Sequence, residues 1–301
     1  MRTSRKALAG IALGIAAVAC FATLDTTTKW VTGSVPLLMA LWFRYLFQAL
    51  ATTLTVLPRR GRALLRTEHP RFHLARGVLL LASSLFAFLS LKYMPVGEFT
   101  AIVMITPLVV TLLSARMLGE RVSALRMLLV AGAFAGTLVI VRPGGQDFNW
   151  TLLLPLALVA VNAAFQLLTS RMTRTEDPMT LQFYTGWVGT LIASLPLPWV
   201  WAEIGSPQLW LGLAVMGATA TLGHFLLILA FQRAPAATLM PYMYTQIGFA
   251  MLGGWLMFSH VPDHWSVLGI ALIALCGAAG AFLSVRESRR TSLRTLQPAA
   301  Q

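Results

Sequence analysis

Residues 7–30 read ALAGIALGIAAVACFATLDTTTKW, and this stretch decides the class of the fold. No charged side chain occurs before Asp25, and the stretch has the length of about 20 mostly apolar residues that a helix needs to cross a bilayer. Nine further apolar stretches of similar length follow. The ten predicted spans run near 7–30, 36–57, 73–91, 96–117, 123–141, 150–170, 179–200, 208–231, 236–259 and 265–285.

The composition agrees with this interpretation. Of the 301 residues, 57% are hydrophobic and 11% are charged, and the mean hydropathy is +0.74. A soluble domain has about 25% charged residues, so this chain lacks the side chains to cover a water-facing surface. An ordinary soluble enzyme and a disordered protein are therefore excluded. The two cysteines form no CxxC motif, which leaves no signal for a disulfide framework, a metal site or a cofactor.

The basic residues set the predicted orientation. With the N-terminus in the cytoplasm, nineteen of the 23 Lys and Arg residues fall on cytoplasmic segments and three fall outside, while Arg44 lies within span two. Cytoplasmic loops of membrane proteins carry such an excess of Lys and Arg. Both termini are therefore predicted to be cytoplasmic, and the net charge of +13 needs no nucleic acid as a partner.

The chain also repeats itself. A shift of 140 residues, without gaps, lays spans one to five on spans six to ten; Leu41 falls on Leu181 and Pro95 on Pro235. Five is an odd number, so the two halves must have opposite orientations. The sequence predicts an all-α integral membrane protein with ten transmembrane helices in two inverted five-helix repeats. The repeats cover 1–145 and 146–286, and a disordered cytoplasmic tail covers 287–301. Inverted repeats are typical of transporters that bind substrate near the membrane midplane.

Several short motifs point to a family. They are Phe21-Ala22-Thr23-Leu24-Asp25 with Lys29-Trp30, Trp42-Phe43-Arg44-Tyr45, Tyr93-Met94-Pro95, Pro107, Gly119-Glu120, Val141-Arg142-Pro143-Gly144, Ala234-Pro235 and Pro241. In this order and spacing, over about residues 8–285, the chain resembles the EamA-type ten-helix branch of the drug/metabolite transporter superfamily. It departs from the family pattern at Ile247, in place of a proline, and at His260, in place of a glutamate.

A narrower resemblance is to the branch that holds bacterial S-adenosylmethionine and riboflavin uptake carriers. It rests on Asp25-Thr26-Thr27-Thr28-Lys29, Phe148-Asn149, the segment 237–244 and Pro262-Asp263. The resemblance implies uptake of a heterocyclic metabolite across the bacterial inner membrane. Export of amino acids or drug-like amines is the alternative within the class.

Charged groups within predicted spans are candidates for function because burying them in lipid is costly. Asp25 and Lys29 lie one helical turn apart; they form either an interfacial ion pair or the outer mouth of a cavity, with a role in coupling or gating. Arg44 lies about eight residues inside span two. It forms a structural bridge to Asp25, binds a substrate carboxylate, or snorkels to the outer face.

Glu98 and His224 are the other candidates for coupling or gating. Glu98 lies near the start of span four, where it either takes up protons or serves as an acid at a helix N-terminus. His224 in span eight is either a neutral imidazole bonded to a neighbouring helix or a proton relay.

Spans six, seven and nine carry uncharged polar groups that must face the bundle. They are Asn162, Gln166, Gln182, Tyr184, Tyr242, Tyr244 and Gln246. Gln166, Tyr184, Tyr242 and Gln246 are predicted to bind substrate together with Arg44. Tyr242, Gln246 and Phe249 recur at helical spacing and offer one face to a planar heterocycle. The alternative is that these groups join neighbouring helices.

These observations predict a secondary-active carrier that works by alternating access. No GxxxxGK[ST] loop occurs, so transport is expected to use a gradient or exchange. The spans contain no converging Ser–Lys, Asp–Asp or His-rich set, which speaks against an intramembrane enzyme; a non-transporting subunit is a further alternative. The expected partners are a small-molecule substrate and membrane lipid. The Gly10-x-x-x-Gly14 and Gly132-x-x-x-Gly136 faces allow a homodimer as well as a monomer.

Overall fold

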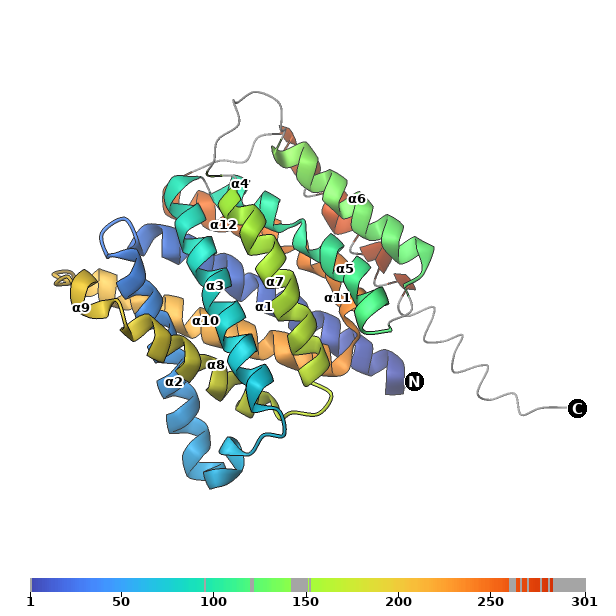
Figure 1. Cartoon of the computed structure of the whole chain (residues 1–301). Coiled ribbons are helices and arrows are strands. Elements are labelled where there is room, and N and C mark those ends of the chain that lie inside the picture. Colours follow the sequence, from blue (N-terminus) through green and yellow to red (C-terminus); the bar gives the residue numbers. More distant parts are fainter. Residues whose placement is uncertain are drawn as a thin grey trace, which may run out of the picture.

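The computed structural model describes residues 2–94, 96–119, 122–141, 151, 153–259, 264–265, 267–269, 271–276, 278–280 and 282–283. Within these ranges the chain is helical and contains no strand (Figure 1). The predicted tail 287–301 lies outside them. The predicted fold class is therefore confirmed as all-α.

The helices follow the apolar stretches closely. They are α1 (Arg2–Val31), α2 (Leu37–Arg60), the 3-10 helix η1 (Gly61–Leu65), α3 (Pro70–Tyr93), α4 (Val96–Val103), α5 (Thr106–Met117), α6 (Ala124–Val141), α7 (Leu153–Met172), α8 (Pro178–Ser194), α9 (Leu197–Val200), α10 (Pro207–Arg233), α11 (Ala236–Met243) and α12 (Gln246–Phe258). Further helical turns lie within 264–283. By length and composition, α1, α2, α3, α7 and α10 are long and apolar enough to cross a membrane.

Two predicted spans are not continuous helices. The span near 96–117 is divided into α4 and α5 at Met104 and Ile105, and the span near 236–259 into α11 and α12 at Tyr244 and Thr245. The two breaks lie 140 residues apart. At both, an amide bonds a carbonyl three residues back instead of four: Ile105 N to Ile102 O at 3.0 Å, and Thr245 N to Tyr242 O at 3.1 Å. Such tight turns within a helix are typical of hinges.

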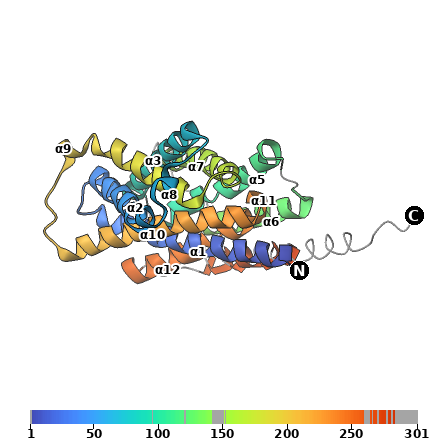
Figure 2. The same ribbon diagram turned by 90° about the horizontal axis from the view of Figure 1, so that it is seen from below.

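The long helices pack mainly in pairs that join the two parts of the chain. Helix α1 lies along α10, α2 along α8, α3 along α7, and α5 along α11 (Figures 1 and 2). The 140-residue shift exchanges the α1–α10 pair with the α3–α7 pair and the α5–α11 pair with a packed α4–α12 pair, and it relates the two members of the α2–α8 pair. The packing thus follows the internal repeat of the sequence.

Small residues allow close approach within these pairs. A Cβ atom built at Gly10 meets Ala234 and Arg233 at 3.1 Å, and one at Gly132 meets the Cys276 Sγ at 2.9 Å. Both GxxxG faces are therefore used for packing inside the chain, where they satisfy the usual need of membrane helices for small residues at contacts.

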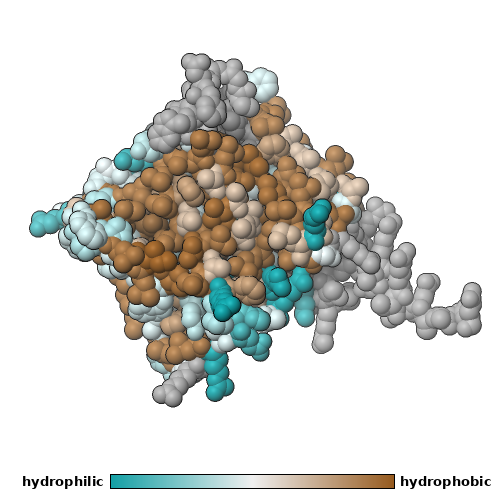
Figure 3. Space-filling view, viewed as in Figure 1, coloured by the Kyte–Doolittle hydropathy of each residue, from teal (hydrophilic) through white to brown (hydrophobic). Residues whose placement is uncertain are grey.

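The outer surface is apolar. Large hydrophobic side chains are exposed on most of the helices, and Figure 3 shows them as a broad brown area across the centre of the molecule, with hydrophilic residues gathered toward its lower edge. Exposed apolar patches of this size on a soluble monomer are rare. A surrounding bilayer accounts for them.

Glu176, between α7 and α8, ties this connection to residues 66–73. Its Oε1 accepts hydrogen bonds from the Thr67 hydroxyl at 2.8 Å and the Glu68 amide at 3.3 Å, and its Oε2 lies 3.4 Å from the His73 Nε2. Burial alone raises the pKa of the Glu176 carboxyl, but the hydrogen bond from Thr67 and the nearby His73 imidazole outweigh burial and lower the pKa below its usual value.

The lowered pKa of Glu176 gives a pH-dependent contribution to stability. A carboxyl whose pKa is lower in the folded state stabilises the protein above its unfolded pKa of about 4.3, and the contribution is lost as the pH falls through the folded pKa. We expect Glu176→Gln to melt below wild type at neutral pH, and the gap to close on acidification. Exposed Glu203, replaced in the same way, is the control. A gap that stays constant with pH would contradict the assignment.

Candidate functional site

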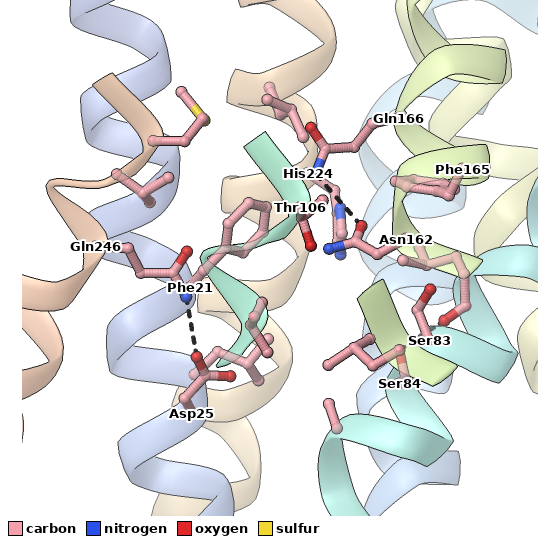
Figure 4. Close-up of a pocket in the computed structure, with 18 of the residues that line it drawn as sticks. Phe21, Asp25, Ser83, Ser84, Thr106, Asn162, Phe165, Gln166, His224 and Gln246 are labelled. Atoms are coloured by element: carbon pink, nitrogen blue, oxygen red, sulfur yellow. Dashed lines mark hydrogen bonds between the residues drawn. The ribbon is translucent and has the colours of Figure 1, made fainter. Parts of the chain in front are cut away.

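A cavity of about 790 Å³, counting its open mouth, lies at the centre of the helical pairs. It is lined by side chains from both parts of the chain, including α1, α3, α5, α7, α10 and α12. Its polar lining consists of Asp25, Arg44, Ser83, Ser84, Thr106, Asn162, Gln166, His224 and Gln246, and its aromatic lining of Phe21, Phe99 and Phe165. Figure 4 shows Asp25 and Gln246 on one side and Ser83, Ser84, Asn162 and Phe165 on the other.

Arg44 is fixed on one wall of the cavity. Helix α2 carries it inward, and only 2% of its surface is exposed. The guanidinium donates to the Ser84 hydroxyl and, through Nη2, to the His224 Nε2 at 3.0 Å, and its Cζ lies 4.6 Å from the centre of the Tyr45 ring. No ion pair joins Arg44 to Asp25, although the structure describes both residues. The predicted alternatives of a bridge to Asp25 and of snorkelling are therefore wrong.

The bond to Arg44 determines the protonation of His224. A guanidinium has only donors, so the His224 Nε2 must accept, and the imidazole is neutral with its proton on Nδ1. Its ring lies between Phe21, at a centroid distance of 4.8 Å, and Phe165, at 5.7 Å. A second proton would place a cation against Arg44 and break the bond. This geometry supports the neutral imidazole bonded to a neighbouring helix over the proton relay.

Asp25 lies on the opposite wall. Its Oδ2 accepts a hydrogen bond from the Gln246 Nε2 at 3.1 Å, and only 9% of the residue is exposed. Gln246 is the first residue of α12, so this bond joins α1 to the break between α11 and α12 (Figure 4).

Lys29 does not pair with Asp25, which corrects the predicted ion pair. Its Nζ donates instead to the carbonyls of Leu91 at 3.2 Å and Met94 at 3.1 Å. The last carbonyls of a helix have no partner within the helix. Lys29 therefore caps the end of α3 and lies outside the cavity lining.

Five polar atoms of the cavity lining are buried without a hydrogen-bond partner. They are the Arg44 Nε, Ser83 Oγ, Thr106 Oγ1, Gln166 Oε1 and His224 Nδ1. Buried polar atoms nearly always have a partner, and leaving one unsatisfied costs about 1–3 kcal/mol. Their concentration around one cavity is typical of a site that receives the missing partners from a polar ligand.

The remaining predicted site residues divide between the cavity and other places. Gln166 lines the cavity, with its amide 3.5 Å from the Asn162 Oδ1. Tyr184 lies elsewhere; its hydroxyl donates to the Leu65 carbonyl at 3.0 Å and its ring packs on His73. Tyr242 is buried but is not part of the lining. The side chain of Glu98 lies outside the described residues.

The face predicted from Tyr242, Gln246 and Phe249 does not form. Helical spacing places residues on one face only when the helix is continuous, and the break at Tyr244 and Thr245 separates Tyr242 from the other two. Gln246 turns toward the cavity, while Phe249 lines a separate apolar groove between α1, α10 and α12.

Sequence reasoning missed three polar residues of the cavity lining, and it placed one buried cation, Arg76, in the cytoplasm. Ser83, Ser84 and Thr106 were not singled out, because hydroxyls in apolar helices commonly bond their own backbone, as the Ser84 Oγ does with the Leu80 carbonyl at 2.8 Å. Arg76, counted as a cytoplasmic residue, is fully buried.

Arg76 is held by hydroxyl and carbonyl oxygens from two helices of the second half. Its Nε donates to the Thr169 Oγ1 at 2.9 Å, and its Nη1 donates to the Leu181 carbonyl at 2.8 Å and to the Thr185 hydroxyl. Its Cζ lies 4.9 Å from the centre of the Phe165 ring, whose residue lines the cavity. A second buried guanidinium thus lies one aromatic ring away from the site.

Comparison with known proteins extends these findings. The chain is 31% identical to the riboflavin transporter of Rhizobium johnstonii, over 95% of this chain and 94% of that protein. It is 27% identical to the S-adenosylmethionine uptake transporter of Rickettsia conorii, over 77% and 78%, and 28% identical to the pseudopaline exporter CntI of Pseudomonas aeruginosa, over 88% and 93%.

The fold has a counterpart among solved structures. One crystal structure superposes with a TM-score of 0.77 at 21% identity, over 92% of this chain and 98% of that chain. The sequence pattern of the EamA-like transporter family matches twice, at residues 8–142 and 149–283. The chain therefore belongs to the EamA-like transporter family, which the motifs of the sequence had indicated.

Proposed function

We propose that the chain is a secondary-active carrier that takes up a planar heterocyclic metabolite of the riboflavin or S-adenosylmethionine kind across the bacterial inner membrane. The observation that carries this proposal is the central cavity, where aromatic rings and five unpartnered polar atoms from both parts of the chain surround one space. Rings bind the faces of a heterocycle, and polar atoms bind its edges.

The proposed architecture is ten transmembrane helices in two inverted repeats, 1–145 and 146–286, with both termini in the cytoplasm. Three observations support it: the two matches of the family pattern, the helix breaks 140 residues apart, and helix pairs that exchange under the same shift. In carriers built from inverted repeats, substrate binds at broken helices between the repeats. Thr106 and Gln246, each the first residue after a break, line the cavity.

Alternating access follows from this arrangement. Rocking of one repeat against the other exposes the cavity to each side in turn, and the breaks at 104–105 and 244–245 supply hinges. The sequence holds no nucleotide-binding loop of the GxxxxGK[ST] type, so transport is driven by a gradient or by exchange. The similarity to a pseudopaline exporter favours export as the second candidate for the direction of transport.

Ligand-induced stabilisation of the detergent-purified protein tests the substrate class. The panel contains riboflavin, S-adenosylmethionine, amino acids and lipophilic amines. A ligand at 100 times its Kd stabilises the protein by about 2.7 kcal/mol, which raises the melting temperature measurably. We expect riboflavin or S-adenosylmethionine to produce the shift. A shift with amines or amino acids alone would contradict uptake of a heterocycle.

A pair of glutamine variants then locates the site. Gln166→Leu removes a cavity acceptor that has no partner, whereas Gln208→Leu makes the same change at an exposed position in the first turn of α10. We expect Gln166→Leu to weaken ligand binding about 2- to 10-fold, the value of one neutral hydrogen bond, and Gln208→Leu to leave it unchanged. Equal affinities would place the binding site elsewhere. Counterflow of labelled ligand in proteoliposomes separates carrier activity from binding alone.

A further inference from the structure

The charges buried around the cavity are unbalanced. In the part of the chain that the structure describes, the helical core around the cavity holds the guanidinium groups of Arg44 and Arg76, exposed by 2% and 0%, and the carboxyl group of Asp25. Arginine stays protonated in proteins, and His224 is neutral because its Nε2 accepts from Arg44. Among the side chains that the structure describes, the surroundings of the cavity therefore carry a net positive charge, whether or not Asp25 is ionised.

The unpartnered atoms on the Arg44 wall are mainly donors. The Arg44 Nε carries a hydrogen, the tautomer fixed above puts a hydrogen on the His224 Nδ1, and the Ser83 hydroxyl can donate; none of the three has an acceptor. All three residues line the cavity and are more than nine-tenths buried. A buried donor is satisfied by an acceptor such as a carbonyl, carboxylate or phosphate oxygen or a ring nitrogen.

Arg76, the second buried guanidinium, adds to the positive charge around the cavity although it is not part of the cavity lining. Arg76 packs on the Phe165 ring without lining the cavity itself, and its hydrogen bonds go to hydroxyl and carbonyl oxygens instead of a carboxylate. These neutral oxygens stabilise the positive charge of Arg76 but do not neutralise it. Charges interact more strongly in a protein interior than in water, so a cation in the cavity is repelled by both arginines.

From these observations we infer that the cavity selects a neutral or anionic heterocycle whose acceptor-rich edge docks on Arg44, Ser83 and His224, and that it discriminates against cations such as sulfonium compounds and protonated amines. This inference rests on the proposed function and narrows its substrate class. Asp25 and Gln246, on the opposite wall, are left to bind the donor groups of the same ligand.

A matched pair of ligands tests the charge selection. S-adenosylmethionine and S-adenosylhomocysteine differ by one methyl group and the positive charge of the sulfonium. Their affinities for the full-length protein, and that of riboflavin, are measured by displacement or thermal shift. We expect S-adenosylhomocysteine to bind more than about threefold more tightly than S-adenosylmethionine, because a repulsion of even about 0.7 kcal/mol gives that ratio. A smaller ratio, or the reverse preference, would overturn the inference while leaving the proposed function intact.

Variants of Arg44 provide a second test of the inference. Arg44→Gln removes the charge and the fork of donors, and we expect it to weaken binding of riboflavin or S-adenosylhomocysteine roughly 10- to 100-fold, the value of hydrogen bonds to a charged group. It should also reduce the preference between the adenosyl compounds. Arg44→Lys keeps the charge, so the preference should persist although affinity falls. Arg233→Gln, at the exposed end of α10, is the control.

The Arg44 variants also test the inference if riboflavin binds the protein and the adenosyl compounds do not. Unchanged riboflavin affinity in folded Arg44→Gln protein would overturn the inference. If neither riboflavin nor an adenosyl compound binds the wild-type protein, the proposed function itself is wrong, and the inference fails with it. The melting temperature of each variant without ligand shows whether it is folded.

Discussion

Gly189→Ala is expected to lower the stability of the purified protein by about 1–3 kcal/mol or more, the usual cost of adding a methyl group to a packed interior. A Cβ atom at this position in α8 lies 2.6 Å from the Tyr45 Cγ and still closer to the Cδ1 and Cε1 carbons of the same ring. Tyr45 is fully buried in α2, so its ring has no solvent-filled space into which it can move.

Tyr45 is also tied to the cavity wall. Its hydroxyl lies 2.9 Å from the Ser84 Oγ, and its ring lies against the Arg44 guanidinium. A ring displaced by the added methyl group must therefore pull on the groups that hold Arg44. For this reason we expect Gly189→Ala to weaken ligand binding in addition to lowering the melting temperature, although Gly189 itself does not line the cavity.

Gly254→Ala is the matched control for this prediction. Gly254 lies within α12, and a Cβ atom there meets nothing within 4 Å. Alanine is favoured over glycine in a helix by up to about 1 kcal/mol, so this variant should be as stable as wild type or slightly more stable. Equal melting temperatures for the two variants would show that α2 and α8 do not pack as closely as described.

The positions of the helices could be predicted from the sequence because lipid imposes one strong condition. A chain that crosses hydrocarbon must bond its backbone internally, so each apolar stretch of sufficient length becomes a helix. The stretch that opens at residue 7 did so in α1. The same hydropathy signal carries no information about the hydrogen-bonding register within a helix, so it does not locate the breaks at 104–105 and 244–245.

Proline explains only part of these breaks. Pro107 lies just inside α5, where it supplies no amide hydrogen and its ring conflicts with the carbonyl four residues earlier. Ile247 occupies the corresponding position after the second break, yet the helix is divided there as well. The second break therefore forms without a proline at the position of Pro107; the proline beside it is Pro241, which lies within α11.

Several residues of the candidate site could be predicted from the sequence, but the hydrogen bonds between them could not. Asp25, Arg44, Gln166, His224 and Gln246 were singled out because polar groups in lipid are costly, and all five line the cavity. Which group bonds which depends on helices far apart in the sequence: Arg44 bonds His224, and Asp25 bonds Gln246. Spacing along one helix, which suggested the Asp25–Lys29 pair, carries no information about such contacts.

Thr169→Val combined with Thr185→Val is expected to destabilise the protein by about 3–5 kcal/mol, the cost of leaving a buried charge without compensation. Both hydroxyls accept hydrogen bonds from Arg76, and all three residues are fully buried. Valine has nearly the shape of threonine, so the double variant removes the acceptors while changing the packing little. The measurement is the free energy of unfolding, or the melting temperature, in one detergent.

Adding Arg76→Met to the double variant should restore much of the lost stability. The cost in the double variant comes from the guanidinium that remains, and an apolar side chain of similar length removes that charge together with its need for acceptors. Thr55→Val, at an exposed position of α2, is the control for the threonine change itself. A triple variant less stable than the double variant would mean that Arg76 stabilises the fold through packing on Phe165 and its bond to the Leu181 carbonyl, and not through the threonine hydroxyls. Restored stability would instead mean that the buried charge is a cost to the fold. The charge of Arg76 would then be retained for the positive electrostatic potential that it creates beside the cavity.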